Sequence, residues 1–170
     1  SSAEADRSGW VESEFPNRSK WFTASVAIAL SRIQRAIRTE HALWARRFLW
    51  VALAETVRLT SNSRTSTFKL HMRSKEDLAA RNTSPVSIFK EITARNLCHL
   101  REQKKTLSER GYLTAGRYKG KVTVRIADSG ASAISDKRYD VLVTSPPYGD
   151  NVTTVPYGQH SYLPLQWIDL

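Results

Sequence analysis

The sequence predicts an α/β fold, in which a basic helical region precedes an incomplete doubly wound sheet. Between residues 21 and 110, apolar residues recur at spacings of three and four, as on one face of a helix. After residue 120, two short runs are rich in β-branched or apolar residues, as in the strands of a parallel sheet. We therefore expect a flexible arm or linker at 1–19, a helical basic region at 20–110 and a partial α/β domain at 111–170.

Three long helices are expected in the helical region, over residues 21–38, 42–59 and 85–110. The second helix carries Trp44, Phe48, Val51 and Glu55 at helical spacing, and we expect its tryptophans to pack in the core. The third helix begins at Ser84-Pro85, where serine caps the helix and proline suits its first position. Gly111 is a typical residue at which such a helix ends. These three segments account for most of the chain before residue 111.

Between the second and third helices lies a polar loop followed by an alternating segment. Residues 59–67 are rich in Ser, Thr and Asn, whose side chains compete for the backbone hydrogen bonds of a helix. In residues 68–73 apolar and basic side chains alternate, as in a short extended segment. Arg64, Lys69 and Arg73 are the candidate contacts to a phosphate backbone. A charged, solvated edge explains the same alternation equally well.

The charge of the chain favours a polyanionic partner. Lys and Arg outnumber Asp and Glu by 26 to 16, which gives a net charge of +10. Residues 32–81 contain eleven basic and four acidic residues, whereas residues 139–170 contain no Lys or Arg. The alternative is a solvated surface that keeps a small domain soluble.

Other classes of protein are disfavoured by composition. The longest apolar runs are too short to cross a membrane, and residues 1–10 lack the pattern of a signal peptide, so we expect a cytoplasmic protein. With Cys98 as its one cysteine, the chain cannot form an internal disulfide or a cysteine zinc cluster, and no metal site is predicted. We expect Cys98 to be a small buried side chain.

The second predicted strand leads directly into a distinctive loop. The first strand, residues 122–126, ends at the turn 127–130, and the second covers residues 139–144. Its continuation is Ser145-Pro146-Pro147-Tyr148. This segment resembles the motif of S-adenosylmethionine-dependent DNA amino-methyltransferases, in which Asp, Asn or Ser precedes Pro-Pro and an aromatic residue. A proline-rich ligand segment is the alternative, but such ligands lie in polar stretches rather than after a buried strand.

The residues of this loop suit methylation of an exocyclic amino group. The nitrogen lone pair of that group is delocalised into the base, so the group is a poor nucleophile. The Ser145 hydroxyl and the Pro146 carbonyl can accept its two hydrogens and free the lone pair. Pro146 and Pro147 stiffen the loop so that both acceptors are fixed in advance. Tyr148 offers a flat face on which an extruded base can stack.

The resemblance implies further features of fold and function. It is clearest over residues 128–170, and residues 149–159 are similar to the continuation of the motif in these prokaryotic DNA methylases. It implies an incomplete Rossmann-like sheet, S-adenosylmethionine as cofactor and duplex DNA with a flipped base as substrate. Asp128 matches the acidic residue that faces the adenosine of the cofactor, although a turn-forming aspartate fits too. Ser145 modestly favours cytosine over adenine as the target, and the motif does not exclude RNA.

Two features of that family are missing from the sequence. No Phe-x-Gly-x-Gly turn for the cofactor occurs among the seven glycines, and 22 residues follow Tyr148 where more strands are expected. The resemblance therefore implies a fragment, a truncated reading frame or one subunit of a split enzyme whose partner chain supplies the glycine-rich loop. A non-catalytic nucleic-acid-binding helical module is the alternative function.

Overall fold

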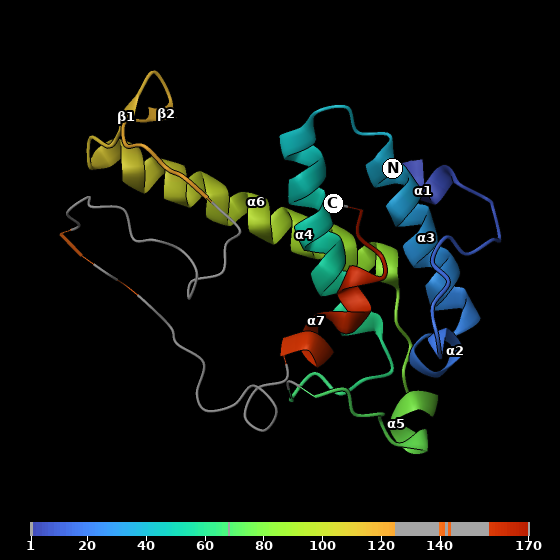
Figure 1. The fold of residues 1–170 in the computed structure, drawn as a ribbon. Coiled ribbons are helices and arrows are strands. Elements are labelled where there is room, and N and C mark those ends of the chain that lie inside the picture. Colours follow the sequence, from blue (N-terminus) through green and yellow to red (C-terminus); the bar gives the residue numbers. More distant parts are fainter. Residues whose placement is uncertain (1, 68, 125–139, 142, 144–156, 170) are drawn as a thin grey trace.

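The computed structural model describes residues 2–67, 69–124, 140, 141, 143 and 157–169. These residues form a mainly helical body from which one long helix extends (Figure 1). The elements, in chain order, are α1 (Ser2–Ala5), α2 (Arg18–Trp21), α3 (Ala24–Arg38), α4 (Leu43–Thr60), α5 (Lys75–Ala79), α6 (Pro85–Glu109), β1 (Leu113–Thr114), β2 (Arg117–Tyr118) and α7 (Tyr157–Leu165).

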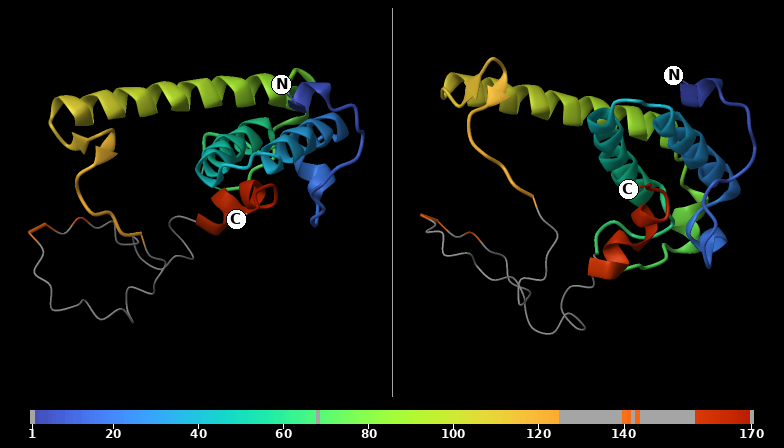
Figure 2. Two further views of the ribbon diagram at one scale, coloured as in Figure 1. Left: turned by 90° about the horizontal axis from the view of Figure 1, so that it is seen from above. Right: turned by 45° about the horizontal axis from the view of Figure 1, so that its top comes forward.

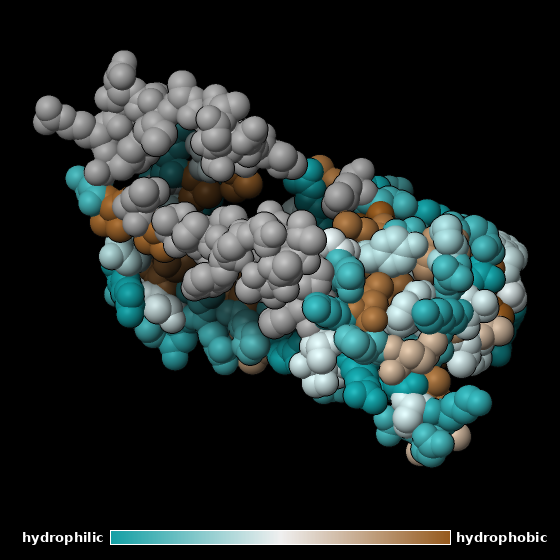
Figure 3. Space-filling view, turned by 60° about the horizontal axis from the view of Figure 1, so that its bottom comes forward, coloured by the Kyte–Doolittle hydropathy of each residue, from teal (hydrophilic) through white to brown (hydrophobic). Residues whose placement is uncertain are grey.

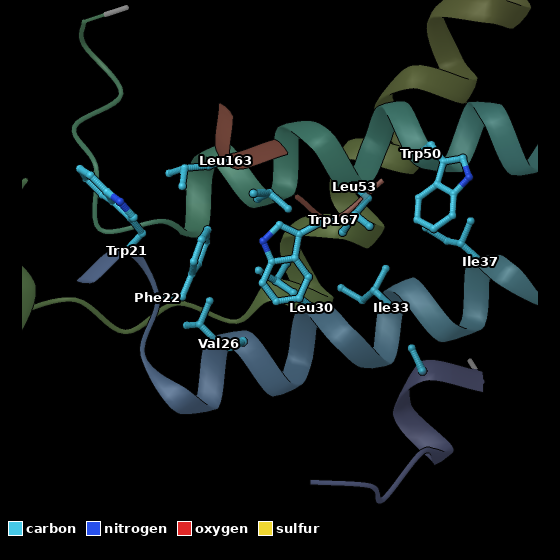
Figure 4. Packing of buried hydrophobic residues seen from close by; sticks show 13 residues of the cluster. Trp21, Phe22, Val26, Leu30, Ile33, Ile37, Trp50, Leu53, Leu163 and Trp167 are labelled. Carbon is cyan, nitrogen blue, oxygen red and sulfur yellow. The ribbon is translucent and has the colours of Figure 1, made fainter. Parts of the chain in front are cut away.

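The core lies between α3, α4, the first turns of α6 and the C-terminal segment. Buried apolar residues from these elements form one cluster (Figure 4). Trp167, which follows α7, is fully buried, and its ring meets Phe22 edge-on with the centroids 5.6 Å apart. Leu163 of α7 is also buried in this core. Residues more than 120 positions apart in the sequence therefore share one hydrophobic core.

The ends of the predicted helices are formed by the expected local interactions. The side chain of Ser84 accepts a hydrogen bond from the Ser87 N–H at the start of α6. At its end, Gly111 has a φ of +71°, and the N–H groups of Gly111 and Tyr112 donate to the carbonyls of Ser108 and Leu107. This pattern needs a left-handed residue, which glycine adopts without strain. The predicted boundaries of the third helix are confirmed to within one residue.

The buried face of α4 differs from the prediction. Trp44 is 76% exposed and Val51 63% exposed, whereas Trp50, Leu53 and Val57 are buried. Because apolar residues occupy most of the circumference of α4, its periodicity offers two candidate faces. The neighbouring helices select the face of Trp50, Leu53 and Val57 by packing on it. The prediction that the tryptophans of this helix are core residues is right for Trp50 and wrong for Trp44.

The second half of α6 leaves the body. Pro85 and Ile92 are buried, and Val86 and Phe89 pack against the core, but beyond residue 93 the described residues of α6 include no buried side chain. The helix projects past the packed helices in both views of Figure 2. Cys98 lies on this projecting part and is exposed, so the prediction of a buried cysteine is wrong. No described residue covers this side chain.

The strands found among the described residues are not those predicted. β1 and β2 form a small antiparallel hairpin in which Leu113 pairs with Tyr118 and Thr114 with Arg117. The described residues of the two predicted strands, 122–124 and 140, 141 and 143, belong to no strand, and their valines are at least 73% exposed. A strand exists only where a neighbour pairs with its backbone, and an alternating side-chain pattern does not supply that neighbour. The prediction of strands is therefore not borne out at these positions.

The segment before α2 lies along α3. Ala3 is buried, and Phe15 packs against the core. Arg35 on α3 binds Asp6 at 2.8 Å and Glu12 at 2.9 Å. The pKa of the Asp6 carboxyl is lowered by hydrogen bonds from Ser8 and, to a smaller extent, from Arg35. The pKa of the Glu12 carboxyl is lowered by hydrogen bonds from Arg35 and, to a smaller extent, from Trp10. The expected division of the chain at residues 19 and 110 stays a prediction.

Candidate functional site

The predicted chemical residues lie outside the described part of the chain. They are Ser145, Pro146, Pro147 and Tyr148 of the proline loop and Asp128 of the preceding turn. The predicted phosphate contacts Arg64, Lys69 and Arg73 are described. The site can therefore be built from the basic residues and from α7, which follows the proline loop in the chain.

Arg64 and Lys69 line one hollow at the end of α4. Its walls come from the last turn of α4, the loop that follows and α7. The lining residues are Arg58, Ser61, Ser63, Arg64, Thr67, Lys69, Leu70, His160, Leu163 and Pro164. Figure 3 views the molecule from below relative to Figure 1, and the described surface on that side is largely hydrophilic with scattered hydrophobic patches. The ionisable side chains that line the hollow are those of Arg58, Arg64, Lys69 and His160.

Backbone hydrogen bonds join the two ends of the loop between Ser63 and Met72. Ser63 and Met72 form an isolated antiparallel bridge, and the Arg64 N–H donates to the His71 carbonyl at 2.7 Å. The Ser63 hydroxyl accepts a hydrogen bond from the His71 N–H at 3.2 Å. The alternating segment is therefore extended in part, as predicted, and the bridge sets the backbone position of Arg64.

The basic residues of the hollow differ in their partners. The Arg58 guanidinium donates two hydrogen bonds to the Glu55 carboxylate, from Nε at 2.8 Å and from Nη2 at 2.7 Å. These hydrogen bonds lower the pKa of Glu55 and raise that of Arg58. Arg64 and Lys69 are exposed, and neither side chain has a hydrogen bond or ion pair with the described residues. Their two charges are available to an anion, whereas that of Arg58 is largely compensated.

Arg73 does not line this hollow. It is half-buried, and its Nε atom has no hydrogen-bond partner among the described residues. Nearby Arg81 is bound to the carbonyl oxygens of Leu59, Thr60 and Ser61 at the end of α4. Burial, and then the charge of Arg73, lower the pKa of Arg81. The structure therefore brings Arg64 and Lys69 together and places Arg73 in a second basic spot.

Sequence reasoning missed the contribution of α7. The Leu70 N–H donates to Gln159 Oε1 at 3.3 Å, and His160 lines the hollow with Arg58. About a hundred residues separate Arg58 from His160, and no local pattern connects them. Their juxtaposition follows from the burial of Leu163 and Trp167, which an apolar spacing of four in 163–167 could have suggested.

The described residues contain another hollow but no candidate metal cluster. A larger hollow of about 580 Å³ lies along α4, lined by Arg38, Leu43, Arg46, Arg47, Trp50, Val51, Ala54, Ile168 and Asp169. Within the described ranges, no group of three or more His, Cys, Asp or Glu is placed to hold a metal ion. None of the helices described is both long and apolar enough to cross a membrane.

A comparison with known proteins bears on this arrangement. The chain is similar to a Type II methyltransferase. It is 34% identical over 152 residues to Type II methyltransferase M.MvaI of Kocuria varians, a match that covers 88% of the chain and 32% of the relative. The chain thus spans about a third of the length of that relative. No protein-family model matches the chain, and no solved structure matches it.

Proposed function

We propose that the chain is part of a DNA methyltransferase that methylates an exocyclic amino group of cytosine or adenine. The observation that carries this proposal is the similarity to a Type II methyltransferase over 88% of the chain. The residues of the proline loop also support the proposal, because Ser145, Pro146, Pro147 and Tyr148 suit this reaction.

The proline loop would hold and activate the target base. The Ser145 hydroxyl and the Pro146 carbonyl accept the hydrogens of the amino group, so that its lone pair is free to attack. Pro147 keeps the loop stiff, and Tyr148 stacks on a base extruded from the duplex. S-adenosylmethionine, when bound, supplies a methyl group on a sulfonium, and Asp128 would hold its adenosine. The role of Asp128 is assigned from the sequence alone.

The basic hollow would bind the phosphate backbone near the target base. Arg64 and Lys69 have no counter-charge among the described residues, and phosphate is the polyanion that a DNA substrate presents. Arg73 would add charge to one side of the same loop. The hollow also borders α7, which begins nine residues after Tyr148. A phosphate contact there would help to position the strand that carries the target base. A cytoplasmic location is part of this proposal.

Methyl transfer to DNA tests the proposal directly. Purified chain, plasmid DNA and S-adenosylmethionine labelled on its methyl group are incubated, and the nucleosides are then separated. Label in N4-methylcytosine or N6-methyladenine is the expected result, lost in the Ser145→Ala and Tyr148→Ala variants. If the chain requires a partner that supplies the glycine-rich loop, calorimetry with S-adenosylmethionine shows no binding until that partner is added. If RNA were labelled and DNA were not, the substrate would be RNA and the proposal of a DNA substrate would be wrong.

A non-catalytic nucleic-acid-binding module is the second candidate, favoured by the uncompensated charges of Arg64 and Lys69. It predicts DNA binding that falls steeply with salt and is unchanged in the Ser145→Ala and Tyr148→Ala variants. A folded chain that binds DNA in this way, yet binds no S-adenosylmethionine and transfers no methyl group with any partner, would support this alternative.

A further inference from the structure

The projecting half of α6 and the hairpin after it form a continuous exposed extension. We define the basic extension as residues 94–121. Within it Asn96, Leu107 and Leu113 are half-buried, and the other side chains are exposed. Its helical part, residues 94–109, is about 24 Å long at 1.5 Å per residue. Both views in Figure 2 show it reaching away from the packed helices. Because nearly all of its side chains are exposed, the extension contributes little to the core. Its amino-acid composition is therefore not explained by core packing.

The basic extension carries most of the net charge of the chain. It contains eight Lys and Arg residues and two Glu residues, a net charge of +6 out of +10 for the whole sequence. The eight are Arg95, Arg101, Lys104, Lys105, Arg110, Arg117, Lys119 and Lys121. This concentration of like charge destabilises an isolated segment through mutual repulsion. It becomes favourable when an anionic surface lies against the segment.

The described part of the chain leaves most of these charges uncompensated. Lys105 and Glu109 form an ion pair at 3.8 Å, and both side chains are more than 60% exposed. Such an exposed pair is weak. For the other basic side chains of the extension, the described residues provide no carboxylate within ion-pair distance. Arg35 and Arg38 of α3 behave differently, because Asp6, Glu12 and Asp169 bind them.

The basic residues form two groups along the extension. Arg101, Lys104 and Lys105 are three and four positions apart on α6, so they share one side of the helix. Arg117, Lys119 and Lys121 occupy every second position from β2 onward. The hairpin that holds the second group is fixed at the end of α6, because the Lys119 N–H donates to the Tyr112 carbonyl at 2.9 Å. The ring-bearing residues Tyr112 and Tyr118 are each about half exposed beside this group.

We infer that the basic extension binds the phosphate backbone of duplex DNA away from the target base. Its helical part matches the length of about seven base-pair steps at 3.4 Å each. Phosphates, spaced regularly and exposed on the duplex, are the anions that two separate basic groups on a long arm can reach together. The identification of the polymer as DNA rests on the proposed function. The location of the binding surface rests on the charge and exposure of residues 94–121.

The salt dependence of DNA binding tests this inference without any methyl donor. Affinity for a 30-base-pair duplex is measured by fluorescence anisotropy between 50 and 300 mM salt. One variant carries Arg101→Gln, Lys104→Gln and Lys105→Gln, and a second carries Arg117→Gln, Lys119→Gln and Lys121→Gln. Each phosphate contact contributes about 0.9 to the slope of log affinity against log salt. Loss of three contacts therefore lowers the slope by up to about 2.7 and the affinity at 0.1 M salt by up to about 500-fold.

The matched control removes three charges from the body, with Arg7→Gln, Arg47→Gln and Lys75→Gln. These side chains are exposed and make no hydrogen bond or ion pair with the described residues. The inference expects a clearly larger change in slope for both extension variants than for the control. The inference is overturned if all three variants show the same slope. It is also overturned if polyglutamate competes for the extension, and so releases labelled DNA, as effectively as unlabelled DNA does. This assay contains no methyl donor, so its outcome is independent of the labelling experiment. Failure to transfer a methyl group with any partner would refute the proposed enzyme activity, and the expected slopes would still support the role of the extension.

Discussion

Tyr148 is the residue on which capture of the target base depends in the proposed function. Stacking of a base on an aromatic ring contributes about 1–3 kcal/mol, so Tyr148→Ala should weaken binding of DNA that contains an extruded base by that amount. Binding is compared on duplexes with and without a mismatch at the target position, since a mismatched base leaves the stack more easily. Tyr148→Phe, which keeps the ring, should bind as the wild type does. If the alanine variant bound the mismatched duplex as tightly as the wild type does, the stacking role would be contradicted.

Arg64 and Lys69 give a second prediction at this scale. The double variant Arg64→Gln, Lys69→Gln should lower the slope of log affinity against log salt by up to about 1.8, because two phosphate contacts are lost. The loss should be similar for all DNA sequences, since phosphate contacts carry no base information. Arg58→Gln is the control, because Glu55 already compensates that arginine. A greater effect of Arg58→Gln than of the double variant would contradict the assignment of the hollow.

Individual residues were predictable where a local pattern defines them. Ser84 and Gly111 were identified because helix capping depends on neighbours within four residues. The basic hollow was predictable only in part, through Arg64 and Lys69 on one loop. Its other side comes from His160, whose position depends on the packing of α7 and not on the sequence around it.

At the scale of single elements, α4 shows how an arginine can replace the usual helix terminator. The carbonyls of Leu59, Thr60 and Ser61 accept hydrogen bonds from the half-buried Arg81 guanidinium. Arg81→Ala should lower the free energy of unfolding by about 1–3 kcal/mol, because those carbonyls lose a charged donor. Urea unfolding followed by circular dichroism measures the change.

Two variants sharpen this prediction. Arg81→Lys keeps the charge but not the planar fork, so it should restore part of the lost stability. Arg47→Ala removes an exposed arginine of α4 that has no hydrogen-bond partner among the described residues, and it should change stability by less than about 0.5 kcal/mol. A loss as small for Arg81→Ala as for Arg47→Ala would show that water replaces the guanidinium.

The existence and approximate length of α3, α4 and α6 were predictable, but the buried face of α4 was not. Periodicity selects a face only when the opposite side is polar, and α4 carries Trp44 and Val51 on one side and Trp50 and Leu53 on the other. The choice depends on where α3 and α7 lie. For the same reason, the alternation in residues 122–126 predicted a strand that the described positions 122–124 do not form.

For the molecule as a whole, Trp167 ties the end of the chain to the helical core. Its side chain is fully buried against Phe22, so Trp167→Ala should lower the free energy of unfolding by about 3–5 kcal/mol. Thermal and urea unfolding of the purified variant measure the loss. Trp167→Phe should cost much less, because phenylalanine keeps the edge-on contact and removes an indole N–H that has no partner within the described part of the protein. An alanine variant as stable as the wild type would place Trp167 outside the cooperative core.

The sequence did not predict α7, nor that Leu163 and Trp167 belong to the same core as α3. This long-range contact closes a loop of more than a hundred residues between Phe22 and Trp167. The spacing of apolar residues cannot predict such a long-range contact, because the contact depends on shape complementarity among four helices. The helical class of the first 110 residues was therefore predictable, and the assembly of the core was not.

The two environments of α6 make one continuous helix behave as two units on the timescale of amide hydrogen exchange. Amides of residues 89–93 lie where the helix packs on the core, so they exchange only when the body opens. Those of residues 98–109 lie in a helical stretch too short to be stable by itself, and they can open by fraying from the hairpin end. Exchange should therefore accelerate along a single unbroken helix, over a boundary near Ala94. A ligand held along the outer half would erase that gradient, because it would have to keep the helix closed in order to stay bound.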